Sequence, residues 1–161
     1  MIRDFIKESG YRALDNRLKR ISDRMAHDTR KFFKQLDLDV EPSWHLVFKL
    51  LKENKGYTMV DIAEQLGYSP PSTVVMLKKM AKKGYIKTKK DPIDKRKQNI
   101  ELTKKALDLL PKLEQIWASC EYAIYQLLKE DLSIIKYLDD IETSLKEIPL
   151  NERFYNEYTK T

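Results

Sequence analysis

Apolar residues recur every three or four positions along most of this sequence, which is the spacing that amphipathic helices show. Charged residues occupy many of the positions between them, so each helix would keep one polar face. The runs predict a mostly helical protein, with helices over residues 11–36, 42–51, 58–67, 69–84, 103–127 and 134–148. The tail from residue 151 contains aromatic residues but is assigned no element.

Proline, serine, threonine and glycine mark the ends of these helices. Pro42 and the pair Pro70 and Pro71 suit first turns, because proline lacks the N–H group that a first turn leaves unpaired anyway. Pro111 lies inside the run 103–127, where the missing hydrogen bond predicts a bend. The predicted caps are Ser69 and Thr103 at helix starts and Gly56, Gly67 and Gly84 at helix ends.

Two short stretches alternate between apolar and polar residues, which is the period of a strand. They are "YIKTKK", with Ile86 and Thr88 on one face, and "NIELT", with Ile100 and Leu102 on one face. The charged stretch "KKDPIDKRKQ" joins them and is longer than the favoured two-residue turn. The pattern therefore predicts a β-hairpin with a charged tip.

Positive charge is concentrated in one quarter of the chain. The whole sequence has a net charge of +6. The segment from Ser69 to Lys105 contains twelve bases and three acids, a net charge of +9, whereas the remainder is at −3. Basic residues gathered in this way form a patch, and polyanions are the usual partners of such patches.

Length and composition exclude several classes of protein. With 161 residues, the chain has room for one ordinary domain but not for two catalytic ones. No apolar stretch approaches the roughly 18 residues that span a bilayer, and no secretory signal pattern begins the chain, so we expect a cytoplasmic protein. The single cysteine and two distant histidines predict no metal site. Without a phosphate loop or nucleophile elbow, neither an enzyme nor a cofactor is expected.

Two short helices joined at Gly67 and followed by a hairpin make a winged helix-turn-helix. Ala63 is small where the two helices would cross, and the polar face of the second helix could enter a DNA major groove. Its lysines would neutralise phosphates, and its first turns would reach base edges. A solvated helix face is the alternative. The predicted DNA contacts are Ser69, Pro71, Ser72, Val75, Lys78, Lys79, Lys82 and Lys83 on the helix and Lys89, Lys90, Lys95 and Lys97 on the wing.

The segment from Asp61 to Thr103 resembles the DNA-binding lobe of the MarR (multiple antibiotic resistance regulator) family of bacterial transcription factors. The wing carries most of the resemblance. Its "DPIDKR" and the later "IELT" follow the family pattern Asp-Pro-x-Asp-x-Arg, three residues, an apolar residue, one residue and Leu-Thr. Two positions depart from the family: Ala106, where many relatives carry glycine, and Val75, where relatives often place a polar or basic residue.

The resemblance implies a fold and a mode of action. The fold is mainly α, a single domain over residues 1–161 with an N-terminal dimerisation helix in 1–40, a winged lobe with a two-stranded wing in 41–103, and C-terminal dimerisation helices in 104–161. A homodimer would set two recognition helices about one turn apart on double-stranded DNA with a pseudo-palindromic operator. Arg96 would enter or line the minor groove, and Asp94 would orient it by an ion pair. The implied function is sequence-specific transcriptional regulation, as a repressor relieved by a small-molecule effector.

Several alternatives stay open. The resemblance implies a crevice for a small aromatic or lipophilic effector, which Trp44, His45 and Trp117 are candidates to line, yet aromatic residues on apolar faces are more often core. Cys120 falls on the apolar seam of a long helix with no evident activating base, which argues against redox sensing. The winged helix could instead be an adaptor that binds protein or RNA. The apolar stripes could also pack on each other within a monomer.

Overall fold

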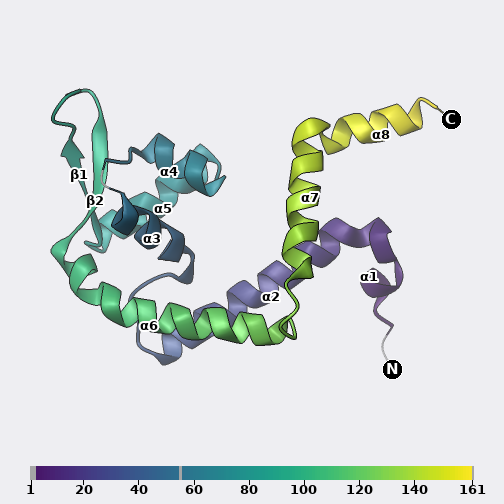
Figure 1. Cartoon of the computed structure of the whole chain (residues 1–161), viewed down its shortest axis with the longest axis horizontal. Coiled ribbons are helices and arrows are strands. Elements are labelled where there is room, and N and C mark those ends of the chain that lie inside the picture. The colour runs from purple at the N-terminus through teal and green to yellow at the C-terminus, as the bar shows by residue number, and fades with distance from the viewer. Residues whose placement is uncertain (1–2, 55, 161) are drawn as a thin grey trace. The chain divides into compact units, whose positions relative to one another are not determined.

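The computed structural model describes residues 3–54 and 56–160, and most of these residues are helical (Figure 1). The chain divides at α6 into two compact units, one up to Leu110 and one from Pro111. The elements in chain order are α1 (Phe5–Glu8), η1 (Gly10–Ala13, a 3-10 helix), α2 (Leu14–Gln35), η2 (Pro42–Trp44, a 3-10 helix), α3 (His45–Glu53), α4 (Met59–Leu66), α5 (Pro70–Lys82), β1 (Ile86–Lys90), β2 (Gln98–Leu102), α6 (Lys104–Leu127), α7 (Ser133–Glu147) and α8 (Leu150–Tyr158).

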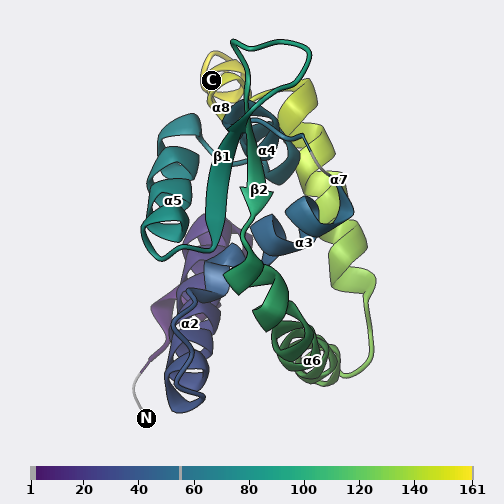
Figure 2. The ribbon, with the colours of Figure 1, turned by 90° about the vertical axis from the view of Figure 1, so that its left-hand side faces the viewer.

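The first unit contains the predicted winged lobe, in which three helices pack with a two-stranded sheet (Figure 2). α4 packs on α5, α3 and α4 contact β2, and α5 contacts β1. The strands are antiparallel, with Ile86 opposite Leu102 and Lys90 opposite Gln98. This register leaves residues 91–97 as the loop at the wing tip. The winged helix-turn-helix fold and the hairpin predicted from the alternating stretches are both confirmed.

The turn between α4 and α5 is set by local chemistry at both ends of α4. Thr58 caps the helix through a reciprocal pair of bonds: its hydroxyl accepts from Asp61 N at 3.3 Å, and its own N–H donates to the Asp61 carboxylate at 2.7 Å. These bonds from Thr58 hold the pKa of Asp61 below its ordinary value. Gly67 ends the helix at φ 63°, a left-handed conformation that glycine adopts without strain. The chain therefore leaves α4 in one direction and enters α5.

The core of the lobe is aromatic and aliphatic. Tyr85, the residue before β1, packs edge-on against Trp44 and Phe48, with ring centroids 5.9 and 5.8 Å apart. Each fully buried large side chain stabilises the fold by about 1.5–3 kcal/mol relative to an exposed one. The side chains with no more than about 2% exposure include Trp44, Val47, Phe48, Ile62, Thr73, Met80 and Tyr85.

Three segments differ from the sequence predictions. The first long helix begins at Leu14, and two short elements, α1 and η1, precede it. α3 ends with Asn54 as its cap, so Gly56 lies in the following loop and the prediction of a glycine cap there was wrong. The tail forms α8, in which Leu150, Phe154 and Tyr158 lie four residues apart on one face. The helical spacing of these residues was not recognised in the sequence because the segment is only nine residues long.

The flanking helices bury little of their apolar surface. Leu14, Leu18 and Ile21 on α2 are between 39 and 49% exposed. No residue of α7 or α8 is buried. In α6, which carries the predicted Pro111 in its interior, Ala106, Leu110, Leu113 and Trp117 are buried, whereas Ile124 and Leu127 are exposed. The bend at Pro111 stays a prediction. None of the helices in the described ranges is both long and apolar enough to cross a membrane.

Candidate nucleic-acid interface

The sequence of α5 separates a buried face from an exposed one, as the spacing predicted. Thr73, Leu77 and Met80 are buried, and Ser69 caps the helix by accepting from Ser72 N at 3.4 Å. The Ser69 hydroxyl also donates to the Ser72 hydroxyl at 2.8 Å, so both hydroxyls lie at the exposed N-terminus. The predicted contact residues on the exposed face are Pro71, Ser72, Val75, Lys78, Lys79 and Lys82. Their contacts with DNA remain predictions.

The wing is attached to α5 through a set of backbone and side-chain bonds. Gly84, at φ 76°, lets the chain reverse after α5, and Tyr85 N donates to Met80 O at 3.0 Å. Thr103, directly after β2, donates its hydroxyl to Gly84 O at 2.6 Å and its N–H to Tyr85 O at 3.0 Å. The same hydroxyl accepts from Ala106 N at 3.3 Å, which confirms the predicted cap. These bonds fix the base of the wing against the end of α5.

The loop at the wing tip is organised around one carboxylate, that of Asp91. It accepts hydrogen bonds from Ile93 N at 2.9 Å, from Asp94 N at 2.8 Å and from the amide of Asn99 at 2.8 Å. The bond from Asp94 N is the main reason that the pKa of Asp91 lies below its ordinary value. Asn99 itself is buried, and Lys97 N closes the loop by donating to Asp94 O at 2.9 Å. These bonds define the shape of the wing tip.

Arg96 extends from this loop into solvent. Its Nε donates to Asp94 Oδ1 at 3.2 Å, and its backbone N–H donates to the same oxygen at 3.1 Å. The Arg96 side chain is 93% exposed, whereas that of Asp94 is 34% exposed. The structure thus contains the ion pair that the family resemblance implied. Among the described residues, the guanidinium bonds to Asp94 through Nε alone, so its terminal nitrogens can bind an anionic partner.

The wing lysines are exposed but differ in their surroundings. Lys89 lies 3.6 Å from the Glu101 carboxylate on the paired strand, and Lys87 lies 3.8 Å from the same group. Within the described residues, Lys90, Lys95 and Lys97 form no ion pair within 4 Å. Glu101 therefore offsets part of the positive charge of Lys87 and Lys89.

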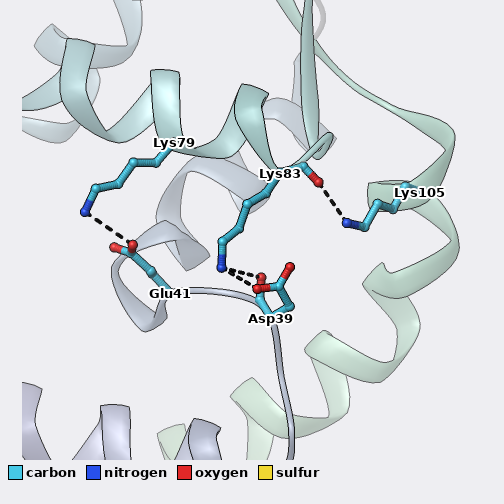
Figure 3. A network of polar contacts seen from close by, with 5 residues as sticks. All are labelled: Asp39, Glu41, Lys79, Lys83 and Lys105. Atoms are coloured by element: carbon cyan, nitrogen blue, oxygen red, sulfur yellow. Dashed lines mark hydrogen bonds and ion pairs between the residues drawn. The ribbon is translucent and has the colours of Figure 1, made fainter.

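Two acids that the sequence analysis did not single out pair with lysines at the C-terminal end of α5, Lys79 in the helix and Lys83 at its cap (Figure 3). Glu41 lies 3.3 Å from Lys79, and Asp39 forms a close ion pair with Lys83. The hydrogen bond between Asp39 and Lys83 lowers the pKa of the carboxyl and raises the pKa of the ammonium. Lys105 donates to Lys83 O at 2.8 Å. These pairs join residues about 40 positions apart, so no local pattern in the sequence could have indicated them.

The exposed face of α5 borders a shallow hollow with a volume of about 390 Å³. Two residues from the start of η2, Glu41 and Ser43, form one side of it. Four predicted contact residues also line the hollow, together with Met76. The hollow therefore belongs to the same surface as the predicted contact residues of α5. Its lining from α5 comprises Pro71, Ser72, Val75, Met76 and Lys79.

The three candidate effector residues do not line this hollow, nor a second hollow formed by the end of α2 and the loop that follows it. Trp44 is completely buried, and its indole N–H has no hydrogen-bond partner among the described residues. His45 Nδ1 lies 3.1 Å from Pro42 O, within the turn that starts α3. Trp117 is buried at 5% exposure. Trp44 thus behaves as a core residue, and an effector role for all three stays a prediction.

Cys120 is only partly buried and lies on α6. Burial, together with the nearby Glu121 charge, raises the pKa of its thiol. A raised thiol pKa reduces the thiolate fraction at neutral pH, which is opposite to what a reactive cysteine needs. This environment argues against redox sensing by Cys120.

The sequence of this lobe is similar to a known family. Residues 38–97, which contain the recognition helix and the wing tip, match the model of the MarR family. The winged lobe is similar to the MarR family over these residues. The match covers less than half of the chain, and it confirms the resemblance that the wing motif indicated. No curated protein matches the sequence.

Solved structures show that the MarR-type fold extends over nearly the whole chain. The transcriptional repressor CouR, bound to a 23-mer DNA duplex, is 23% identical with a TM-score of 0.72, and the match covers 88% of this chain and 99% of CouR. The S. aureus MepR–DNA complex is 23% identical with a TM-score of 0.71, covering 82% of this chain and 97% of MepR. A MarR protein from Peptoclostridium difficile is 20% identical with a TM-score of 0.68, covering 91% and 94%. Likeness at this level of identity establishes the fold.

Proposed function

We propose that this protein is a dimeric, sequence-specific DNA-binding transcription regulator that acts as a repressor and is released by a small-molecule effector. One observation carries the DNA-binding part: the exposed basic face of α5 and the outward-pointing Arg96 belong to one lobe whose wing is bonded to the helix. A helix of this kind fits a major groove, and an arginine beside it fits the adjacent minor groove. The DNA complexes of CouR and MepR support this assignment.

The dimer is supported by the apolar faces that the flanking helices leave exposed. Leu14, Leu18, Ile21 and Met25 follow one face of α2, and all are at least 39% exposed. Monomeric proteins rarely expose a continuous apolar stripe of this length. Burial of such stripes against a second copy would also place two recognition helices on one duplex, which a pseudo-palindromic operator requires.

The dimer can be tested with a matched pair of charge substitutions on α2. Ile21→Glu puts a carboxylate on the apolar face, whereas Lys19→Glu puts one on the polar face, where Lys19 pairs with Asp23. Sedimentation should show a dimer for the wild type and for Lys19→Glu, and a monomer for Ile21→Glu. A wild-type monomer at micromolar concentration would contradict the proposed assembly.

DNA binding can be tested by gel-shift titration over a series of salt concentrations. Neutralisation of several phosphates releases counterions, so the affinity for duplex DNA should fall steeply as salt increases. We expect single-stranded DNA and heparin to compete poorly at moderate salt. Equal binding of duplex, single strands and heparin would instead favour an adaptor that binds protein or RNA.

The effector part rests on the similarity of residues 38–97 to the MarR family. Salicylate is a convenient aromatic probe, because it is small, apolar on its ring and anionic. Release of bound duplex by salicylate, measured by fluorescence anisotropy, would support the effector role. Unchanged anisotropy with salicylate and with a medium-chain fatty acid would contradict an effector role for both aromatic and lipophilic acids.

A further inference from the structure

The segment between α2 and η2 attaches to the recognition helix through two ion pairs. Glu41 lies 3.3 Å from Lys79, and Asp39 pairs with Lys83, both near the C-terminal end of α5 (Figure 3). We call residues 36–41 the acidic linker. Lys83 also lies over the Trp44 ring at 5.7 Å. The acidic linker thus contacts lysines that the sequence analysis predicted to neutralise phosphates.

Glu41 borders the surface that is proposed to enter the major groove. It lines the same hollow as Ser72, Val75 and Lys79. The Lys79 side chain is 56% exposed and that of Glu41 is 43% exposed, so water reaches both groups. An exposed lysine–carboxylate pair is weak, and its members exchange partners readily. A DNA phosphate arriving at α5 would therefore compete with Glu41 for the same ammonium group.

The two carboxylate pairs of the lobe differ in their effect on charge. Asp94 accepts from one guanidinium nitrogen of Arg96, and the other two have no bond to the residues that the structure describes. Lys79 has a single ammonium, which is a point charge, and a carboxylate beside it offsets the attraction that a phosphate would feel. Glu41 and Asp39 consequently reduce the positive potential of the end of α5, whereas Asp94 mainly orients Arg96.

We propose that the acidic linker is an internal competitor for the recognition-helix lysines, so that DNA binding requires Lys79 to exchange Glu41 for a phosphate. The inference rests on the proposed DNA-binding function. It assigns to Glu41 and Asp39 a role in limiting duplex affinity. Because the linker directly follows α2, the exchange also couples the attachment of that segment to DNA binding, and each must weaken the other.

The test compares three substitutions that each remove one negative charge. Glu41→Gln and Asp39→Asn release the lysines, and Asp23→Asn removes a matched carboxylate that pairs with Lys19 at 2.8 Å on the polar face of α2. The probe is a scrambled-sequence duplex of about 30 base pairs at low salt. Glu41→Gln should bind about three- to tenfold more tightly at a similar salt slope, because Lys79 contacts a phosphate in both complexes, and Asp39→Asn should act in the same direction. Asp23→Asn should stay within about twofold of the wild type.

A second arm asks whether Glu41 acts through Lys79. In a Lys79→Gln background, the gain from Glu41→Gln should shrink to less than about twofold, because the lysine to be released is absent. A gain that persists in full would show that Glu41 acts on DNA directly and would overturn the exchange.

The outcomes separate this inference from the proposed function. If the wild type binds duplex and Glu41→Gln behaves like Asp23→Asn, the internal competition is overturned while DNA binding stands. If neither wild type nor variants prefer duplex to single strands at low salt, the proposed function fails and the inference fails with it.

Discussion

The winged lobe and the helices that flank it cover their apolar side chains in different ways. Ile62 in the lobe is fully buried, whereas Ile134 on α7 is 44% exposed. Every large apolar side chain of α7 and α8 remains at least partly accessible. The difference shows that the lobe takes its shape from its own core. The flanking helices have apolar faces that the described chain leaves uncovered, which is the condition for assembly with a second copy.

The largest effect should come from replacing an isoleucine of the lobe by alanine, and the same replacement in a flanking helix provides the comparison. Ile62→Ala removes three methylene-sized groups from a closed core and should lower the free energy of unfolding by about 2–5 kcal/mol. Ile134→Ala should lower it by less than about 1 kcal/mol when the chain is monomeric, because its side chain keeps contact with water. Urea denaturation at low protein concentration measures both. Equal losses would show that the flanking helices also have a closed core.

Arg96→Ala sharpens the comparison for DNA binding. Removal of the exposed guanidinium from the wing tip should weaken operator binding about tenfold to a hundredfold and reduce the preference for A·T-rich flanks. Arg24→Ala is the control, since Arg24 also pairs with an aspartate, Asp28, but lies on α2 outside the lobe. It should leave the affinity within about twofold. If both variants bind like the wild type, the wing tip has no part in recognition.

A smaller effect should follow from the cap of α4. Thr58→Ala removes the hydroxyl that accepts from Asp61 N and should destabilise the lobe by about 1 kcal/mol. Binding to DNA should weaken only through this loss of stability, so raising the protein concentration should restore it. Chemical denaturation and anisotropy on the same samples separate the two. A large loss of affinity with unchanged stability would place Thr58 in the interface.

The smallest effect concerns acid sensitivity. The pKa of Asp61 is lower in the folded chain than in the unfolded one, so its contribution to stability is present above pH 4 or so and is lost as the pH falls through the folded value. Asp61→Asn should therefore be less stable than the wild type at pH 7, and the difference should shrink as the pH falls below about 4. Thermal unfolding over this pH range measures the convergence. Parallel curves would mean that the Asp61 charge makes no contribution.

Much of the lobe could be predicted because its signals are local. The Ser69 cap and the Gly67 turn each depend on residues only a few positions apart. The alternation of apolar and polar residues around Ile86 and Ile100 indicates the two strands of the wing directly. The motif also predicted that Asp94 and Arg96 meet, since they lie two residues apart in a tight loop. Sequence reasoning succeeded where the interacting groups are neighbours along the chain.

The parts that could not be predicted depend on contacts between distant residues or on weak periodicity. The pairs of Glu41 with Lys79 and Asp39 with Lys83 arise only when the segment after α2 folds back along α5. The hydrogen bond from Asn99 on β2 to Asp91 could be predicted only if the register of the hairpin were known. The helix α8 has only nine residues, too few to show a convincing period. The Asp91 cluster was detectable in part, because an aspartate before proline commonly starts a turn.

The most direct test of the central claim is in vitro selection of duplexes bound by the wild-type protein from a random library. The proposed dimer, with a basic α5 and an Arg96 wing in each copy, predicts an inverted repeat whose half-sites lie about one helical turn apart, flanked by A·T-rich steps. Recovery of an unenriched pool, or of a single motif without two-fold symmetry, would contradict it.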